Sequence, residues 1–398
     1  MNNWKKCKLG DICSKITDGS HKSPPSQTSG FPMASVKDME YNQINLNTCR
    51  KISKEDYLEL VASGCQPEIN DILIAKDGSY LKHVFRVRKK EELVLLSSIA
   101  IIRPILEQVC PQFLIYVFKN KRFIEEIESN YVTGAVIPRI VLRDFKEIEI
   151  TLPPLEEQRQ IAAILSSIDD KIELLHEQNK TLEELAQTLF RHYFIENSNP
   201  SWQNVKLGDL VEVVDNRGKT PPLSNENTIY PVVEVNSLNG ESRVINYSVV
   251  RKYIDKETYD TWFRAGHPKK YDVLISTVGS IGELAMFLDD IGSIAQNVVA
   301  LRASSDYKCY LYEALKFMKN DLKELDIGSV QPSIKIPHLL SLAILKPNGL
   351  ILQKFNDEVL KFIDKISSNV KQIQTLENMR DILIPKLLNG EIKVGGNQ

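Results

Sequence analysis

The sequence lacks three features that would place it in a simple class: a CxxC pair, an apolar run long enough to cross a bilayer, and a strong excess of one charge. Its six cysteines are scattered from Cys7 to Cys309, which is typical of free thiols in a reducing compartment and not of a disulfide framework or a zinc site. No uninterrupted apolar run approaches the roughly 20 residues of a membrane span, and the residues after Met1 lack the apolar core of a signal peptide. We therefore expect a cytoplasmic protein that makes no contact with a membrane.

Catalytic motifs are also missing from the sequence. Gly218-Lys219-Thr220 resembles the end of a phosphate-binding loop, but the earlier glycine of that motif would fall at Val213. No glycine-rich fingerprint follows a strand and opens a helix, and the six histidines show no metal-ligand spacing. The sequence therefore predicts a protein that is not itself an enzyme and that binds no cofactor directly.

What the sequence does contain is a globular composition with nearly balanced charge. Of its 398 residues 42% are hydrophobic, which is sufficient for two or three cores. The 50 basic and 52 acidic residues leave a net charge of −2, which excludes a histone-like binder that relies on bulk positive charge. Any nucleic-acid surface must come from local clusters of basic residues.

The two halves of the sequence repeat one another. Short motifs of the first half return in the same order in the second half, at offsets between 194 and 201 residues. The matched segments are Trp4 and Lys8–Asp11 with Trp202 and Lys206–Asp209, Asp71–Ile74 with Asp272–Ile275, Gly134–Pro138 with Gly328–Pro332, Asp170–Ile172 with Asp364–Ile366, and Thr181–Glu183 with Thr375–Glu377. One match would be chance, whereas five in the same order indicate a tandem duplication.

Each repeat ends in a long helix with a heptad seam. From Ile161 to Leu189, and again from Phe355 to Leu383, the seam positions recur at alternating steps of four and three. Each helix has only one narrow apolar stripe, so we expect the two to pair, and the order of the segments makes that pairing antiparallel. Asn179 and Asn369 interrupt the seams. We hypothesise that they meet and fix the register; the alternative is that each faces water.

Prolines and glycines indicate where these helices begin and end. Pro153-Pro154 suits the first turn of a helix that we predict from Leu155 to Tyr193. Pro385 is expected to bend or end the second helix, with Asn389-Gly390 as a stop beyond it.

The rest of each repeat has the pattern of a mixed α/β domain. Short apolar or alternating runs between Gly, Pro, Asn and Ser predict strands at 71–75, 97–102, 148–152, 272–276 and 296–301. One amphipathic helix is expected in each repeat, at 111–128 and at 310–325. We predict an α+β fold in which two similar globular domains are joined by two long antiparallel coiled-coil helices and related by a pseudo-twofold axis. The predicted segments are the globular domains 1–152 and 201–346 and the spacer helices 153–200 and 347–398, the last with a C-terminal tail.

Charge is distributed unevenly between these segments. Residues 151–200 carry 4 basic and 9 acidic side chains, which makes the first helix a poor phosphate binder. Basic residues cluster instead in turn-rich stretches of the globular domains, at 18–22, 76–79, 82–90 and 217–220. Short polar side chains and flexible backbone on such loops are what contacts to phosphates and base edges require.

Several of these motifs resemble one protein family. The segments Leu152-Pro153-Pro154-Leu155-Glu156-Glu157-Gln158 and Leu387-Leu388-Asn389-Gly390-Glu391-Ile392, with the order globule, helix, globule, helix, resemble the specificity subunit of type I restriction-modification systems. Lys8–Asp11, Gly78-Ser79, Gly279-Ser280 and Arg217–Pro221 resemble recurring patches of the same family. The second repeat departs from the pattern, because Lys346–Leu350 replaces the double proline and the Glu-Gln pair is absent.

The resemblance implies a non-catalytic subunit whose two target-recognition domains each read one half of a bipartite target in double-stranded DNA. Two methyltransferase subunits, which use S-adenosylmethionine, would dock on it, and two restriction subunits could join them. Reading domains on one face of DNA should contact half-sites about one helical turn apart, roughly 34 to 36 Å. As DNA contacts we predict Lys22, Lys76, Arg139, Arg217, Lys219 and Lys335, with Ser79, Thr277, Ser280 and Gln331 as polar readers.

Two other readings compete with DNA recognition. One is a coiled-coil scaffold that joins two domains for a partner other than DNA, and the other is a self-sufficient enzyme with an unrecognised site. The missing catalytic motifs weigh against the enzyme. The polar loops that recur in both repeats weigh against the plain scaffold.

Overall fold

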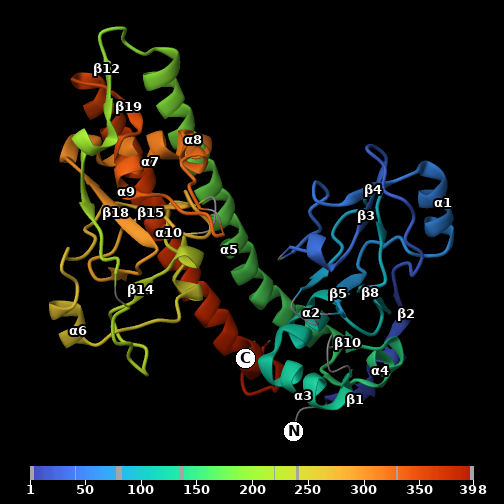
Figure 1. Ribbon diagram of the computed structural model, residues 1–398. Helices are drawn as coiled ribbons and strands as arrows, with labels where there is room; N and C mark the ends of the chain where they lie inside the picture. The colour runs from blue at the N-terminus through green and yellow to red at the C-terminus, as the bar shows by residue number, and fades with distance from the viewer. Residues whose placement is uncertain are drawn as a thin grey trace. The chain divides into compact units, whose positions relative to one another are not determined.

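The computed structural model describes residues 4–40, 42–77, 83–133, 139–218, 220–238, 242–328 and 330–394. For residues 132, 133 and 139 it describes the backbone alone. The chain forms two compact units (Figure 1). Unit 1 contains residues 1–172 and 375–398, and unit 2 contains residues 173–374. Each unit therefore combines one globular domain with part of both long helices. The four-segment division expected from the sequence stays a prediction of domain limits.

The centre of unit 1 is a four-stranded antiparallel sheet. Its strands are β2 (Cys13–Asp18), β8 (Ile99–Pro104), β5 (Ile72–Ala75) and β6 (Val84–Arg86), in that spatial order. Both faces of the sheet are covered, because alternate residues of β5 enter two different apolar clusters. Ile72 and Ile74 pack on the side of the helices, whereas Leu73 and Ala75 pack on the opposite side.

Unit 2 repeats this sheet strand for strand. The order is β13 (Val211–Val214), β18 (Val298–Ala303), β15 (Val273–Ser276) and β16 (Leu284–Met286), and every pairing is again antiparallel. The repeat extends to single side chains. Arg103 donates two hydrogen bonds to buried Asp71, at 2.8 and 2.9 Å, and Arg302 does the same to Asp272, at 3.2 and 2.7 Å. The duplication predicted from the sequence is thus confirmed.

Smaller sheets flank the central one in both units. Strand β1 (Lys5–Lys8) pairs antiparallel with β11 (Glu149–Leu152), as β12 (Gln203–Lys206) does with β19 (Ala343–Lys346). Parallel pairs join β3 (Phe31–Ala34) to β7 (Val94–Leu95) and β14 (Val232–Val233) to β17 (Ser293–Ile294). The structure of unit 1 further shows β4 (Arg50–Ile52), β9 (Val132–Thr133), β10 (Arg139–Ile140), α1 (Lys54–Ala62) and α4 (Leu142–Glu147), and that of unit 2 shows α6 (Lys256–Thr261) and α9 (Ile336–Leu340).

The amphipathic segment of each repeat is two helices where one was expected. In unit 1 the chain forms α2 (Pro111–Lys119) and α3 (Lys121–Tyr131), and in unit 2 it forms α7 (Lys308–Phe317) and α8 (Lys319–Glu324). The break in unit 1 falls at Asn120, whose extended backbone (ψ 117°) interrupts the helix. Met318 makes the corresponding break in unit 2 with ψ 22°. The apolar pattern continues across both breaks, so the hydrophobic periodicity did not indicate them.

The first long helix begins at Leu155 as predicted and extends beyond the predicted Tyr193, whereas the second begins at Leu350, inside the predicted segment 347–398. Helix α5 (Leu155–Phe190) continues as a π-helical stretch to Glu196, and α10 (Leu350–Leu388) passes through Pro385 before it stops at Asn389-Gly390. Gly390 has a positive φ of 74°, a conformation that suits glycine after a helix.

The two helices pair antiparallel within each unit. In unit 1 Ile161 and Leu165, early in α5, share a core with Ile384 and Leu387, late in α10. In unit 2 Ala186 and Phe190, late in α5, share a core with Phe355 and Val359, early in α10. The two seam asparagines meet as hypothesised, because Nδ2 of Asn369 donates a buried hydrogen bond of 2.7 Å to Oδ1 of Asn179. That the pair fixes the register stays a prediction. Among the described residues, no helix is both long enough and apolar enough to span a membrane.

Candidate nucleic-acid interface

Three of the turn-rich stretches, 18–22, 76–79 and 217–220, follow strands β2, β5 and β13 and begin at one edge of the central sheet of their unit. Strands β2 and β5 both pair antiparallel with β8, so they run in the same direction and end at the same edge. The same holds for β13 and β15 beside β18. We call these the loop edges of unit 1 and unit 2.

Within unit 2 the loop edge joins two segments that are far apart in the sequence. The backbone N–H of Gly279 donates to the carbonyl of Pro332 at 3.0 Å, and the N–H of Ile334 donates to the carbonyl of Thr277 at 2.8 Å. Gly279 has a φ of 84°, and the Gln331 amide lies 3.5 Å from where a Cβ at this glycine would stand. The chain therefore brings the predicted readers Ser280 and Gln331 together, and both are exposed.

Thr277 and Lys335 complete this part of the loop edge in different ways. Thr277 is fully buried, and its hydroxyl donates to the carbonyl of Asn297 at 3.3 Å. It therefore supports the loop from beneath and does not face solvent as a reader would. Lys335 is exposed at the N-terminal cap of α9.

Arg217 lies on the loop that follows β13, where it is held by a neighbouring carboxylate. Its guanidinium donates to both oxygens of Asp215, at distances from 2.7 to 3.0 Å. Burial raises the pKa of Asp215, but the hydrogen bonds and charge of Arg217 outweigh burial, and the net shift is downward. Asn216 ties the loop to the rest of the unit through hydrogen bonds with Ala265 and Gly266.

The loop edge of unit 1 presents its cations differently. Lys76 is only 9% exposed and lies between Asp18 and Asp77, with N–O distances of 3.3 and 3.5 Å. Lys22 is exposed, and its ammonium donates to both carboxylate oxygens of Glu59 at 2.8 and 2.9 Å. Lys22 can therefore turn to a new partner at little cost, whereas Lys76 is part of the support of its loop.

The remaining predictions fall outside what the structure describes. Ser79 and Lys219 lie outside the described residues, and for Arg139 only the backbone, in β10, is described. The backbone nevertheless shows that unit 1 joins the same two segments as unit 2. The N–H of Ile140 donates to the carbonyl of Lys76 at 3.2 Å, in the manner of Ile334 and Thr277.

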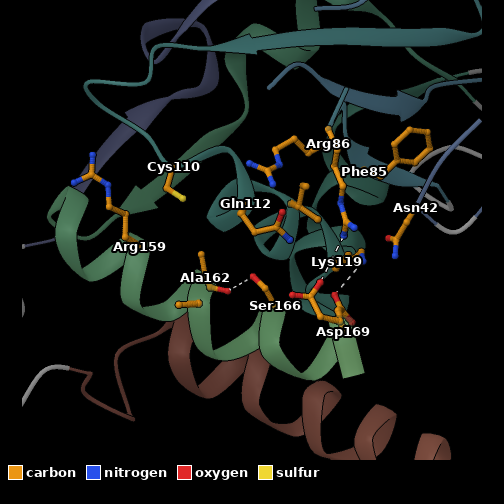
Figure 2. Close-up of a pocket in the computed structure, with 14 residues that line it drawn as sticks. Asn42, Phe85, Arg86, Cys110, Gln112, Lys119, Arg159, Ala162, Ser166 and Asp169 are labelled. Carbon is orange, nitrogen blue, oxygen red and sulfur yellow. Dashed lines mark hydrogen bonds and ion pairs between the residues drawn. The ribbon is translucent and has the colours of Figure 1, made fainter. Parts of the chain in front are cut away.

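A cavity of about 430 Å³ in unit 1 was not predicted from the sequence. Its wall includes Asn42, Arg86, Arg88 and Lys119, together with residues of α5 (Figure 2). The basic stretch 82–90 was a signal for part of this wall. No sequence pattern indicated that α2 and α5 would supply the rest. Among the described residues, no group of His, Cys, Asp and Glu side chains is placed to hold a metal ion.

Comparison with known proteins defines the class. A family model described as the type I restriction modification DNA specificity domain matches residues 1–184 and again residues 199–378. The chain belongs to this family and carries two copies of its domain. It is a specificity subunit, a DNA-recognition component that is not the catalyst, and it acts with other subunits of a restriction-modification system and with DNA.

Individual relatives agree with this assignment. The MjaIX specificity subunit of a type I restriction enzyme from Methanocaldococcus jannaschii is 29% identical over 314 residues, which cover 72% of this chain and 70% of that protein. The HindI specificity subunit from Haemophilus influenzae is 21% identical over 480 residues, covering 98% of this chain and 100% of that protein. The crystal structure of the S subunit of a type I system from M. genitalium has the same fold, with a TM-score of 0.60, 18% identity, and coverage of 100% of this chain and 97% of that one.

Proposed function

We propose that the two loop edges each read one half of a bipartite DNA target, with the exposed residues of each edge as the contact surface. The observation that carries the proposal is the repeated geometry of these edges. In both units the segment after the second strand of the central sheet in sequence, β5 or β15, is hydrogen-bonded to a segment before the long helix, at Lys76–Ile140 and at Thr277–Ile334. The described side chains on the two edges differ, which is what two different half-sites require.

The geometry favours separate roles for the candidate residues. Ser280 and Gln331 are exposed neighbours whose side chains can both donate and accept hydrogen bonds, so they are suited to base edges. Lys22, Arg217 and Lys335 are exposed cations suited to phosphates. We keep Ser79, Arg139 and Lys219 as candidates on the basis of their sequence positions. Lys76 and Thr277 are reassigned to support of the loops.

Partners follow from the same proposal. Two methyltransferase subunits would dock on the protein and carry S-adenosylmethionine, and two restriction subunits could join them. The protein would act in the cytoplasm, where its DNA is. Because a methyltransferase must extrude its target adenine, the recognition units must hold the duplex firmly enough to offset a few kcal/mol of unstacking.

A gel-shift experiment with the chain and its methyltransferase partner tests the proposal. Binding to a duplex with the target, identified by mapping methylated adenines in the host genome, should fall steeply as salt rises, because each phosphate contact releases counterions. A duplex of equal length with one half-site scrambled is the matched control. DNA binding that is absent or insensitive to salt would favour a scaffold for another ligand.

Two lysine variants separate contact from support. Lys22→Ala should weaken binding to all duplexes alike and reduce the salt slope by about one, with no loss of stability. Lys76→Ala should lower the thermal stability of the chain, because Asp18 and Asp77 lose a largely buried partner.

A variant of Gln331 tests base reading. Gln331→Ala should relax the preference at one base pair by about 1 to 3 kcal/mol. A loss of affinity in Lys22→Ala that differs between duplexes would contradict the phosphate role, and an unchanged preference in Gln331→Ala on every base-pair variant would contradict the base-reading role.

A further inference from the structure

The cavity of unit 1 is lined by basic groups from three elements. Arg86 ends strand β6, Lys119 ends helix α2, and Arg159 lies in the first turns of α5. Figure 2 shows Arg86 and Gln112 extending into the space above α5, with Arg159 at one end and Lys119 and Asp169 at the other. The volume of about 430 Å³ falls within the range of roughly 300 to 1,000 Å³ that is typical of small-molecule sites.

The acidic groups of this wall already have partners in the protein. Asp169 accepts from Tyr116 and from Arg380, both at 2.9 Å, and lies 3.6 Å from the Lys119 ammonium. Asp170 lies 3.7 Å from Arg88. Arg86, by contrast, has a buried Nε without a hydrogen-bond partner among the described residues, and one longer bond of 3.4 Å to Asn70. The cavity wall thus has donors to spare and an excess of positive charge.

In unit 2 a buried arginine stands at the position of Asn42, one of the residues that line the cavity of unit 1. Counted back three residues from a matching hydrogen bond, Asn42 of unit 1 stands where Arg243 stands in unit 2. The bonds run from Asn45 to Asp38 and from Asn246 to Ser237, both at 2.9 Å, and the loop that they close is two residues longer in unit 2. Arg243 is fully buried, and its guanidinium donates to Glu183 and to Glu313 at 2.8 to 2.9 Å. An internal charged side chain therefore occupies this place in unit 2.

The residues beside this position also differ in charge between the two units. By strand register Arg86 corresponds to Met286, and the following hydrogen bonds to Asp71 and Asp272 place Arg88 opposite Leu288. Unit 2 thus has apolar residues at these two strand positions, beside a central arginine whose charge is paired with Glu183 and Glu313. Unit 1 combines arginine walls with a short asparagine and an open space.

We propose that this cavity of unit 1 binds a phosphate group. Arginine forks and a lysine suit a phosphate, which has several acceptor oxygens and a charge of −1 in the DNA backbone or close to −2 in a free phosphate monoester. The proposal does not rest on DNA recognition, because the cavity lies on the face of the central sheet that packs against α2 and α5 and not at the loop edge. The phosphate can come from a free small molecule or from the DNA backbone, and the experiment below distinguishes these sources.

Calorimetric titration of the full-length chain with pyrophosphate, at constant ionic strength and without DNA, tests the proposal. The wild type should bind one pyrophosphate. Arg86→Met, which introduces the residue of unit 2, should weaken binding by at least about tenfold, because a charge-assisted bond is lost. Arg191→Met removes an exposed arginine elsewhere and should leave binding unchanged. Arg88→Leu, the second unit 2 residue, gives the same test if Arg86→Met does not fold.

The outcomes separate the sources of the phosphate from failure of the proposal. If duplex DNA displaces pyrophosphate from the wild type, and this displacement is not seen with Arg86→Met, the ligand is a phosphate of the DNA backbone. Simultaneous binding of both would identify a free phosphate compound. No saturable heat with the wild type, or equal affinity in the wild type and in Arg86→Met, would overturn the proposal whether or not the chain recognises DNA.

Discussion

At the scale of single residues, Asp169 connects three elements of unit 1. Its carboxylate lies on α5, and its partners are Tyr116 and Lys119 of α2 and Arg380 of α10. Burial raises the pKa of this carboxyl, but Lys119 and Arg380 outweigh burial, so the net shift is below the ordinary value of 3.8. The folded state therefore holds the charged form more strongly than the unfolded chain does.

This shift predicts an acid-dependent loss of stability. A carboxyl with a lowered pKa stabilises the fold above its unfolded pKa of 3.8, and this contribution is lost as the pH falls through the lower folded value. Asp169→Asn should cost about 3 kcal/mol at neutral pH, because two cations lose a buried partner, and the deficit should shrink below pH 3.8. Urea denaturation at a series of pH values measures both effects.

A neighbouring carboxylate provides the control for Asp169. Asp170 is exposed and 3.7 Å from Arg88, so Asp170→Asn should change stability by less than about 1 kcal/mol at any of these pH values. A deficit in Asp169→Asn that stays constant down to the lowest pH would show that the charge of Asp169 is not what connects the three elements.

Sequence reasoning found the positions of several exposed cations but not the groups that hold them. Lys22 and Arg217 were predicted as contacts and are exposed. Their partners arise in different ways: Asp215 is two residues from Arg217, whereas Glu59 is brought to Lys22 by tertiary structure, 37 residues away. Lys76 has the same local pattern as Lys22, yet the fold buries it beside Asp18. Burial depends on which strands pair, and a turn-rich stretch contains no signal of that.

At the scale of elements, the seam of α5 and α10 combines apolar packing with one polar pair. Asn369 donates to Asn179 and also to Gln178, at 2.7 and 2.9 Å, in a stretch where Ile366 and Ile373 are buried. Any shift of register would leave these amides in apolar surroundings without partners. The pair therefore favours one register over its neighbours.

A double-mutant cycle at this pair gives the element-scale prediction. Asn369→Leu should destabilise the chain by about 1 to 3 kcal/mol, because Asn179 stays buried without its partner. Replacing both asparagines with leucine should restore stability or exceed it, since no polar group is then left unsatisfied. Denaturation midpoints of the wild type, both single variants and the double variant measure the coupling.

An exposed asparagine of the same helix is the matched control for the cycle. Asn378→Leu should shift the midpoint little, because Asn378 faces solvent. Additive single effects, with a double variant as unstable as their sum, would show that the two asparagines do not act as a pair.

The elements that were predicted best from the sequence are those with a regular hydrophobic periodicity. The five predicted strands and both long helices are present, because alternation and heptads persist over whole elements. The breaks at Asn120 and Met318 were missed, because the apolar pattern of α2 with α3 and of α7 with α8 continues across them. The decisive feature at each break is a backbone conformation, which periodicity does not report.

At the scale of the whole molecule, duplication explains both what is shared and what differs between the units. The shared features are structural: the sheet order, the Asp–Arg pairs and the hydrogen bonds that close the loop edges. The differing features are side chains at equivalent backbone positions, such as Asn42 and Arg243. A duplicated framework thus allows each unit to change its ligand without changing its fold.

If the long helices set the distance between half-sites, their length should set the unread gap of the DNA target. Four residues inserted beside Asn179 and four beside Asn369 would lengthen both helices by about 6 Å and rotate them by about 40°. One base pair of DNA adds roughly 3.4 Å and 34°, so the preferred gap should grow by one to two base pairs. Gel shifts on duplexes with stepwise gaps measure this. The same four residues inserted after Glu391, beyond the end of α10, should leave the gap unchanged. An unchanged gap in the helix insertion, with both half-sites still read, would mean that the helices do not measure the DNA.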